Sequence, residues 1–317
     1  MKFRKIDFID FESKNILTRK IWLVIIMYVA VFFAYNILLI PGSFIITMIN
    51  MANHPEINSL TFEGALQLAQ LPNAQIFSLF ATSLGILIAL LYVKFLEKRP
   101  LGSTGIVKKG FFSQYALGYL IGIVMIGLPA MAVALYNGKI EINSNPNFLL
   151  LLIYFFGFLV QGASEEIMFR GYLLTSLAKS KNVFWGIIIS SVLFAVAHSL
   201  NPNMSWLSVI NLFLYGVFAA LIFLRTKNIW LVSALHSAWN YFQGNVFGIE
   251  VSGQVFGESF MNITSNSPAL LSGGNFGLEG GLFVTILLVA ASIIVLYVGK
   301  GSLMVESSNS ETAEETV

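Results

Sequence analysis

The feature that most constrains this chain is its series of long apolar segments, because about 20 apolar residues in a row cross a lipid bilayer as a helix. Hydrophobic residues make up 56% of the 317 residues and charged residues only 11%, against about 25% charged in a soluble domain. The sequence therefore predicts an all-α, polytopic integral membrane protein with about eight transmembrane helices. These lie near residues 21–40, 76–93, 115–135, 148–164, 183–198, 206–224, 229–243 and 281–298.

The distribution of Lys and Arg indicates how the chain is oriented, because these residues concentrate in cytoplasmic loops. They occur before the first span, between the second and third, and in the turns at 179–181 and 225–227, whereas segments 41–75 and 244–280 contain none. We therefore expect cytoplasmic N- and C-termini and a multi-pass protein of the plasma membrane. The basic residues flank the spans, so we expect lipid around the protein and no nucleic-acid partner.

The chain divides into three parts. Residues 1–147 hold three spans, 148–243 hold four, and 244–317 hold a Gly-rich outer loop, the last span and an acidic tail. The tail, 306–317, is rich in Ser, Glu and Thr without apolar periodicity, which predicts disorder. The sequence has no Cys, which excludes a thiolate nucleophile and a thiolate metal site.

Three charged residues interrupt the fourth apolar segment. Glu165, Glu166 and Arg170 follow an apolar run that begins at Phe148, although each ionised group costs about 2.5–3.5 kcal/mol at the centre of a spanning helix. The helix is expected to run from about 148 to about 178. A Glu four residues before an Arg on a helix is the favourable order for an ion pair. Arg170 is therefore expected to neutralise Glu166, while Glu165, about 100° away around the helix, stays free for chemistry.

Two further polar groups lie in the fifth and seventh spans. His198 follows Phe194 by four residues, and Asn240 follows His236 by four, so each pair shares a helix face. Counted at about 1.5 Å per residue, Glu165, His198 and His236 fall in one broad slab near or beyond the midplane. We expect them to meet in a shared, water-accessible cavity. The third histidine, His54, lies in an outer loop and is expected to be solvated.

A carboxylate, two imidazoles and an amide are suitable for hydrolysing a peptide bond. In one route Glu165 and His198 deprotonate water while His236 and Asn240 stabilise the oxyanion. In another, Glu165, His198 and His236 bind Zn²⁺, which lowers the pKa of its bound water. The helical signature of two histidines with a Glu between them is absent, and both routes stay open.

Three motifs carry a resemblance to a known family. Glu165 to Arg170 reads EExxxR, Phe194 to His198 reads FxxxH, and His236 to Asn240 reads HxxxN. In this order and spacing they resemble the CPBP intramembrane protease family, also called the abortive-infection family, which includes the type II CAAX prenyl endopeptidases. The resemblance covers about residues 148–243, without a departure from the three motifs.

The resemblance implies a helical membrane fold with a conical cavity that the Gly-rich segment borders. It implies an intramembrane endopeptidase that cleaves a membrane-associated or lipidated peptide or protein near its C-terminus, as in CAAX processing, or near its leader, as in bacteriocin processing. Glu165 would be the base, His198 its assistant, and His236 and Asn240 the oxyanion site, with Glu166, Arg170 and Phe194 in supporting places. The family is described both as metal-dependent and as metal-independent.

Two other classes of protein fit these residues. A non-catalytic bacteriocin-immunity or membrane scaffold protein would use the same polar cavity to bind a partner. A proton-coupled transporter would also place Glu, His and Arg in the membrane, but the sequence lacks the inverted pair of broken helices that is typical of transporters.

Overall fold

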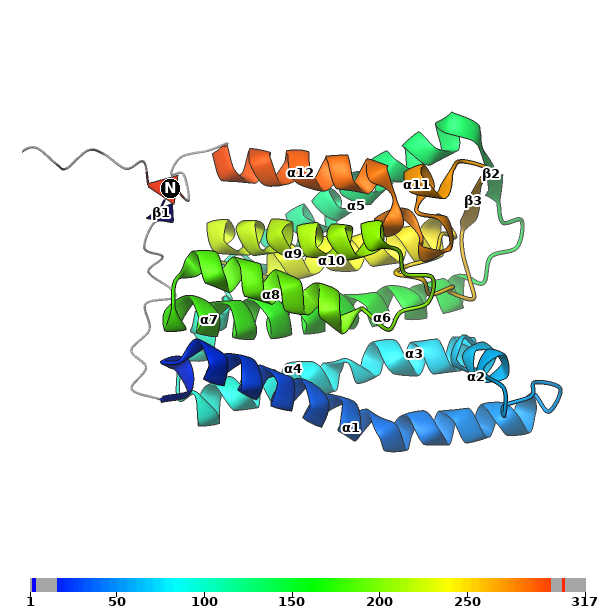
Figure 1. The fold of residues 1–317 in the computed structure, drawn as a ribbon. Helices are drawn as coiled ribbons and strands as arrows, with labels where there is room; N and C mark the ends of the chain where they lie inside the picture. Colours follow the sequence, from blue (N-terminus) through cyan, green and yellow to red (C-terminus); the bar gives the residue numbers. More distant parts are fainter. Residues whose placement is uncertain (1, 4–15, 298–303, 306–317) are drawn as a thin grey trace, which may run out of the picture.

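The computed structural model describes residues 2–3, 16–297 and 304–305, and its long helices lie side by side in layers (Figure 1). The predicted disordered tail lies outside the described residues. The α-helices are α1 (Ile21–Asn53), α2 (Phe62–Ala69), α3 (Pro72–Ala81), α4 (Ser83–Leu91), α5 (Phe111–Asn137), α6 (Phe148–Glu166), α7 (Thr175–Ser180), α8 (Val183–Ala197), α9 (Trp206–Thr226), α10 (Ile229–Tyr241), α11 (Ala269–Ser272) and α12 (Leu282–Tyr297).

Shorter elements complete the fold. Three π-helical turns extend α-helices, namely η3 (Tyr92–Leu96) after α4, η5 (Ile167–Leu174) between α6 and α7, and η6 (Phe242–Val246) after α10. The 3-10 turns are η2 (Ile16–Thr18), η4 (Leu101–Thr104), η7 (Gly274–Phe276) and η8 (Leu278–Gly280). Strand β2 (Gly138–Ile142) pairs antiparallel with β3 (Met261–Ser265), and β1 (Lys2–Phe3) pairs with β4 (Met304–Val305).

The chain is an all-α, multi-pass membrane protein, as the sequence predicts. Within the described part, five helices are long and apolar enough to cross a membrane: Ile21–Asn53, Pro72–Leu96, Phe111–Tyr136, Phe148–Ser180 and Trp206–Thr226. The other three predicted spans are shorter helices, α8, α10 and α12. The side chains of Asn182 and Asn228 cap the starts of α8 and α10 by accepting backbone N–H groups, at the residues where the sequence predicts these spans to begin. The predicted helix from 148 to 178 is one span with a π-helical turn inside it.

Helix α10 lies at the centre, packed between α5 and α6. Two glycines permit this approach, because a Cβ at Gly118 of α5 would collide with the backbone of Leu231. A Cβ at Gly162 of α6 would lie 2.5 Å from the Ser237 hydroxyl. Small residues let membrane helices pack closely. Gly162 stands three residues before Glu165, so this contact brings the EExxxR and HxxxN segments together.

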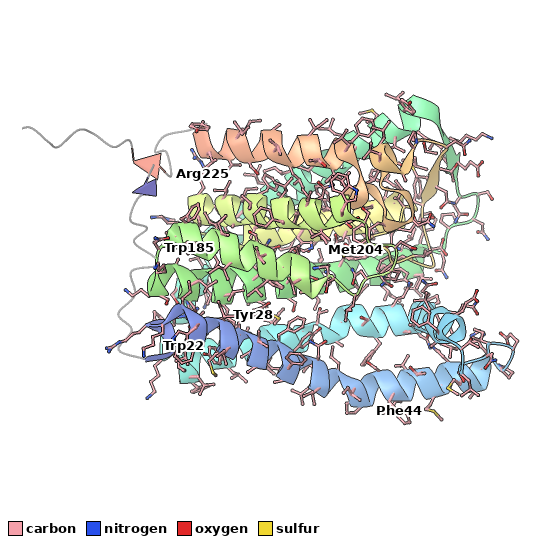
Figure 2. All side chains as sticks on the ribbon, in the orientation of Figure 1. Trp22, Tyr28, Phe44, Trp185, Met204 and Arg225 are labelled. Carbon is pink, nitrogen blue, oxygen red and sulfur yellow. The ribbon has the colours of Figure 1, made fainter. Side chains whose placement is uncertain are left out.

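The outer faces of the bundle are apolar. Figure 2 shows Trp22 and Phe44 on α1, and these side chains are 54% and 64% exposed, whereas Tyr28 on the same helix is buried. Exposed aromatic and aliphatic side chains on this scale are expected of a surface that faces lipid. The polar groups that the sequence places in the apolar helices point inward instead.

Candidate active site

Glu165 lies one residue before the end of α6, where the helix changes into the π-helical turn η5. π-helical turns inside α-helices are frequent at functional sites. One carboxylate oxygen, Oε1, accepts a hydrogen bond of 2.6 Å from Gln161, one helical turn earlier. The other oxygen, Oε2, is buried and has no hydrogen-bond partner. A buried acceptor without a partner is uncommon in folded proteins and is one mark of a catalytic group.

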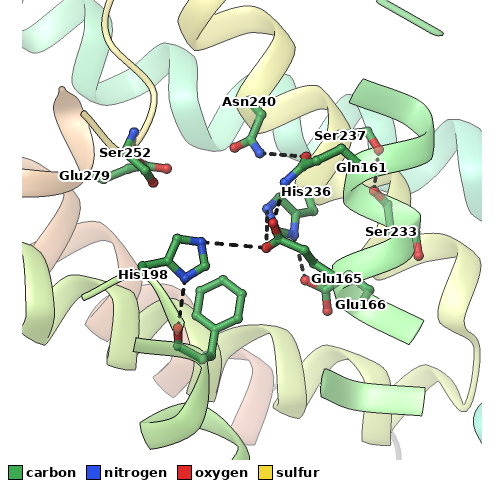
Figure 3. Close-up of polar contacts among 12 residues, drawn as sticks. Gln161, Glu165, Glu166, His198, Ser233, His236, Ser237, Asn240, Ser252 and Glu279 are labelled. Carbon is green, nitrogen blue, oxygen red and sulfur yellow. Dashed lines mark hydrogen bonds and ion pairs between the residues drawn. The ribbon is translucent and has the colours of Figure 1, made fainter. Parts of the chain in front are cut away.

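The two histidines of the motifs converge on this oxygen. Nε2 of His198 and Nε2 of His236 each lie 3.8 Å from Oε2 of Glu165 (Figure 3). His198 follows the last residue of α8, and His236 lies in the middle of α10. The structure therefore brings together the three residues that the sequence places in different spans.

The hydrogen bonds at Nδ1 determine which ring nitrogen of each imidazole carries a proton. Nδ1 of His198 lies 2.8 Å from the carbonyl oxygen of Phe194, which can only accept, so Nδ1 carries a proton. Nδ1 of His236 lies 2.7 Å from Oε1 of Glu166 and is a donor for the same reason. In its neutral form, each ring then directs an Nε2 lone pair toward Glu165. Three acceptor atoms facing one another favour a proton, a water molecule or a cation between them.

Glu166 and Arg170 form the predicted ion pair, with 3.0 Å between Arg170 Nη1 and Glu166 Oε1, and both side chains are buried. The pair has a second role that spacing could not predict, because Oε1 of Glu166 also accepts a hydrogen bond from Nδ1 of His236. The guanidinium of Arg170 also lies 4.6 Å from the ring centroid of Phe194, within cation–π range. Phe194 in turn lies 4.6 Å from the His198 ring. The supporting residues therefore form one packed group behind the histidines.

Sequence reasoning missed Gln161. Its amide oxygen accepts a 3.0 Å hydrogen bond from Asn240 Nδ2, while its amide nitrogen donates to Glu165. Gln161 thus links the predicted base to the predicted oxyanion donor. The available signal was its position four residues before Glu165, which places both side chains on one helix face.

A cavity of about 550 Å³ adjoins the site, and Glu165, His198, His236 and Asn240 line it. The Gly-rich segment borders the cavity, as the resemblance implies, through Val251, Ser252, Gln254 and Phe256. Glu279, which sequence reasoning also missed, lines the cavity, and Figure 3 shows it beside Ser252. This geometry agrees with the prediction that the three spans meet around one cavity.

Two carboxylates outside the spanning helices have shifted pKa values. Burial raises the pKa of Glu279 above its ordinary 4.5, although the backbone N–H and hydroxyl of Ser252 donate to it and oppose the shift. Hydrogen bonds from its own backbone N–H and from His54 lower the pKa of Glu56. His54 lies 3.1 Å from Glu56 at the surface, so it takes no part in the cavity.

The donor types at the site suit zinc, since two imidazoles and a carboxylate are usual zinc ligands. Both histidines are also held at Nδ1 by an acceptor, as metal-bound histidines usually are. Zinc ligands lie about 2.0–2.2 Å from the ion. Among the described residues, however, no group of three or more His, Cys, Asp or Glu is arranged to hold a metal ion. The donor chemistry fits, but the coordination shell is not closed, and we derive no step through a metal.

The fold and site define a class, namely a polytopic membrane protein with a buried glutamate and two histidines at the wall of an internal cavity. Comparison with known families narrows the class. Residues 147–242 match the family model described as type II CAAX prenyl endopeptidase Rce1-like. The match confirms the resemblance carried by the three motifs, all of which lie within it, and supports a CAAX-type intramembrane endopeptidase in general terms. No curated protein matches the sequence.

Proposed function

We propose that the protein hydrolyses a peptide bond of a membrane-associated or lipidated peptide or protein within the bilayer, with water activated by Glu165 and His198. The observation that carries the proposal is Oε2 of Glu165. This atom is buried without a hydrogen-bond partner, lies 3.8 Å from both Nε2 atoms and belongs to a cavity-lining residue. Oε2 of Glu166 is also buried without a partner, but Glu166 does not line the cavity.

In the first step, a water molecule between Glu165 and the substrate carbonyl loses a proton to Oε2 as its oxygen bonds to the carbonyl carbon. The carbonyl electron pair moves onto its oxygen and forms the oxyanion. In the second step, the oxyanion re-forms the carbonyl and the carbon–nitrogen bond breaks, while the leaving amine takes the proton from Oε2 of Glu165, directly or after its transfer to Nε2 of His198. Positioned general acid–base groups of this kind contribute about 10²–10⁴-fold to a rate.

His236 and Asn240 would stabilise the oxyanion. Asn240 Nδ2 uses one N–H on Gln161 and can offer the other. His236 already donates through Nδ1, so it can serve as a second donor only when Nε2 is also protonated. The ion-paired Glu166 on the far side of the ring favours that imidazolium. The proposal therefore assigns Glu166 a part in the reaction as well as in stability.

A zinc-dependent route is the second proposal for the same reaction, favoured by the two Nε2 lone pairs that face the unpaired Oε2. Glu165, His198 and His236 would hold the ion, which when bound would supply a water of lowered pKa. Metal content of the purified protein separates the two routes. Stoichiometric zinc that is lost in both His198→Ala and His236→Ala would establish the zinc route.

The test of hydrolysis is cleavage of a quenched fluorescent peptide by the protein purified in detergent. We expect Glu165→Ala and His198→Ala to lose activity by about 10²-fold or more. Glu63→Ala, which changes an exposed glutamate of α2, is the matched control and should keep wild-type activity. Unchanged cleavage in Glu165→Ala would contradict the proposal. A partner that co-purifies and still binds Glu165→Ala, without any cleavage, would favour the immunity or scaffold function.

A further inference from the structure

Two aromatic side chains of the cavity wall carry hydrogen-bond donors that nothing in the described part of the chain accepts. Tyr215 lies in α9 and is 7% exposed, and Trp239 lies in α10 and is 1% exposed. The Tyr215 hydroxyl and Nε1 of Trp239 are both buried without a hydrogen-bond partner, and both residues line the cavity. Buried Tyr and Trp side chains usually find a partner for their polar atom. These two donors are therefore available to a molecule that occupies the cavity.

Packing holds the two donors side by side. The rings of Tyr215 and Trp239 meet edge to face, with their centroids 5.6 Å apart. The Tyr215 ring also lies 5.1 Å from the His236 ring and 5.7 Å from the Phe194 ring. Trp239 follows His236 by three residues on α10, so the two side chains share a helix face. The donors thus have fixed places next to the histidine that the proposed function assigns to the oxyanion.

A place in the cavity wall distinguishes Tyr215 from the other tyrosines of similar burial. Tyr28, Tyr92, Tyr119 and Tyr172 also have buried hydroxyls without a partner, but none of these four lines the cavity. Among the wall residues that the structure describes, the remaining buried polar atom without a partner is Oε2 of Glu165. The wall therefore offers one acceptor for the reacting water and, separately, two donors from Tyr215 and Trp239.

The chemistry of the two donors determines what they bind. The indole N–H of Trp239 can only donate, so the ligand atom must be an acceptor. Inside a bilayer, a peptide has no bulk water to satisfy its main-chain carbonyl groups, and each carbonyl left unpaired is costly. A carbonyl oxygen has two lone pairs and can accept from both donors at once. A main-chain carbonyl of a peptide in the cavity matches this pair of donors.

We infer that Tyr215 and Trp239 form a subsite that binds one main-chain carbonyl oxygen of the substrate, beside the scissile carbonyl that His236 and Asn240 receive. The inference rests on the proposed function and adds two substrate-binding residues to it. A carbonyl that does not react is bound equally well in the ground state and in the transition state. The subsite therefore strengthens substrate binding and leaves the chemical step to Glu165.

The subsite is tested first by binding, so that the result does not depend on turnover. The probe is a fluorophore-labelled Ala/Leu peptide, and its dissociation constant is measured on Glu165→Gln protein in detergent. Adding Tyr215→Phe, which deletes only the hydroxyl, should raise the dissociation constant by about three- to tenfold, the worth of one hydrogen bond. Adding Trp239→Phe, which deletes the N–H, should raise it by a similar factor.

Tyr119→Phe is the matched control. It deletes a buried hydroxyl without a partner from α5, a helix that contributes no residue to the described wall. The dissociation constant should stay within about twofold of the parent.

Melting temperatures of the same proteins separate a binding role from a structural one. The Tyr215 hydroxyl has no partner within the protein, so its removal should not lower the melting temperature. Weaker binding by Tyr215→Phe at an undiminished melting temperature is the expected result. A lowered melting temperature with unchanged binding would give the hydroxyl a structural role and overturn the inference.

The carbonyl itself is identified with a series of the same peptide in which one main-chain carbonyl oxygen at a time is replaced by sulfur, a weaker acceptor. One position should bind less tightly to the Glu165→Gln protein. The same replacement should cause no further loss when Tyr215→Phe and Trp239→Phe are both added, because the contact is already gone. A loss of equal size with and without the two donors would overturn the inference.

Kinetics distinguish the subsite from the oxyanion site and from the proposed function. In protein that retains Glu165, Tyr215→Phe should raise KM more than it lowers kcat. A fall in kcat at unchanged KM would place the hydroxyl on the oxyanion and overturn the subsite. If cleavage depends on Glu165 but neither donor affects binding, the inference alone fails. Binding that depends on both donors, without any cleavage, would contradict the endopeptidase and leave the carbonyl subsite standing.

Discussion

Two buried glutamate–arginine pairs of this protein have the same charges and very different surroundings. Beside α7, Glu97 accepts from Arg99 and, through both oxygens, from the Ser176 hydroxyl at 2.8 and 2.9 Å. Arg99 also donates to the hydroxyls of Ser103 and Ser176 and to the carbonyl of Tyr172. Each carboxylate oxygen of Glu97 thus has a partner, and the pair joins the loop after η3 to η5 and α7.

The Glu166–Arg170 pair in the candidate active site does not have a hydrogen-bond partner for every carboxylate oxygen. Oε1 of Glu166 accepts from both Arg170 and His236, while its Oε2 is buried and has no partner. Arg170 makes one longer bond, 3.4 Å to the Gly216 carbonyl, and otherwise faces aromatic rings, including that of Phe194. Ion pairs that are fully hydrogen-bonded hold a fold together. A pair with spare acceptor capacity can hold a histidine whose charge changes during a reaction.

The largest effect is expected from Arg170→Met, which leaves Glu166 as a buried charge without its cation. We expect the free energy of unfolding to fall by about 3–5 kcal/mol, as measured by thermal or denaturant unfolding in detergent. The double variant Glu166→Gln/Arg170→Met should recover part of the loss, because the uncompensated charge is gone. A loss below about 1 kcal/mol in the single variant would show that the pair is accessible to water.

The two pairs are expected to differ most clearly in the activities of the variants Glu166→Gln and Glu97→Gln. Both remove a buried carboxylate paired with Arg, so both should lower stability. Activity per folded molecule should fall by about 10²-fold or more in Glu166→Gln, because His236 loses the carboxylate that orients it and favours its protonated form.

Glu97→Gln should keep the wild-type turnover number within about twofold, since Glu97 holds no residue of the site. Turnover numbers of the folded fractions check both expectations. Equal loss of activity in the two variants would remove the distinction between the pairs.

The smallest effect concerns Glu279, a carboxylate without an arginine. Burial raises its pKa above 4.5, so its contribution to stability is present below pH 4.5 and is lost as the pH rises through the folded-state pKa. Glu279→Gln should therefore become more stable relative to wild type as the pH rises from 4.5, as followed by melting temperatures across pH. A difference that stays constant with pH would show that Glu279 does not titrate in this range.

Much of this arrangement follows from local rules that a sequence displays. The apolar runs predicted the helical membrane fold, and i, i+4 spacing predicted the contact of Glu166 with Arg170 and the shared face of His236 and Asn240. The same spacing placed Phe194 beside His198, and their ring contact follows from it.

Contacts between helices could not be predicted, because spacing along one helix does not show which neighbour a side chain reaches. The bonds from His236 to Glu166 and from Asn240 to Gln161 are of this kind. The Ser252 contact of Glu279 depends on the path of the Gly-rich segment, which has no periodicity to guide a prediction. The catalytic roles themselves stay predictions.

The central claim is that Glu165 acts with the two histidines on water at the cavity wall. It is tested most directly by the initial rate of peptide cleavage for Glu165→Gln, beside Glu63→Gln as control, with both proteins shown to be folded. We expect Glu165→Gln to lose about 10²–10⁴-fold of the rate at undiminished thermal stability, and Glu63→Gln to match wild type. Cleavage by Glu165→Gln at the wild-type rate would contradict the account.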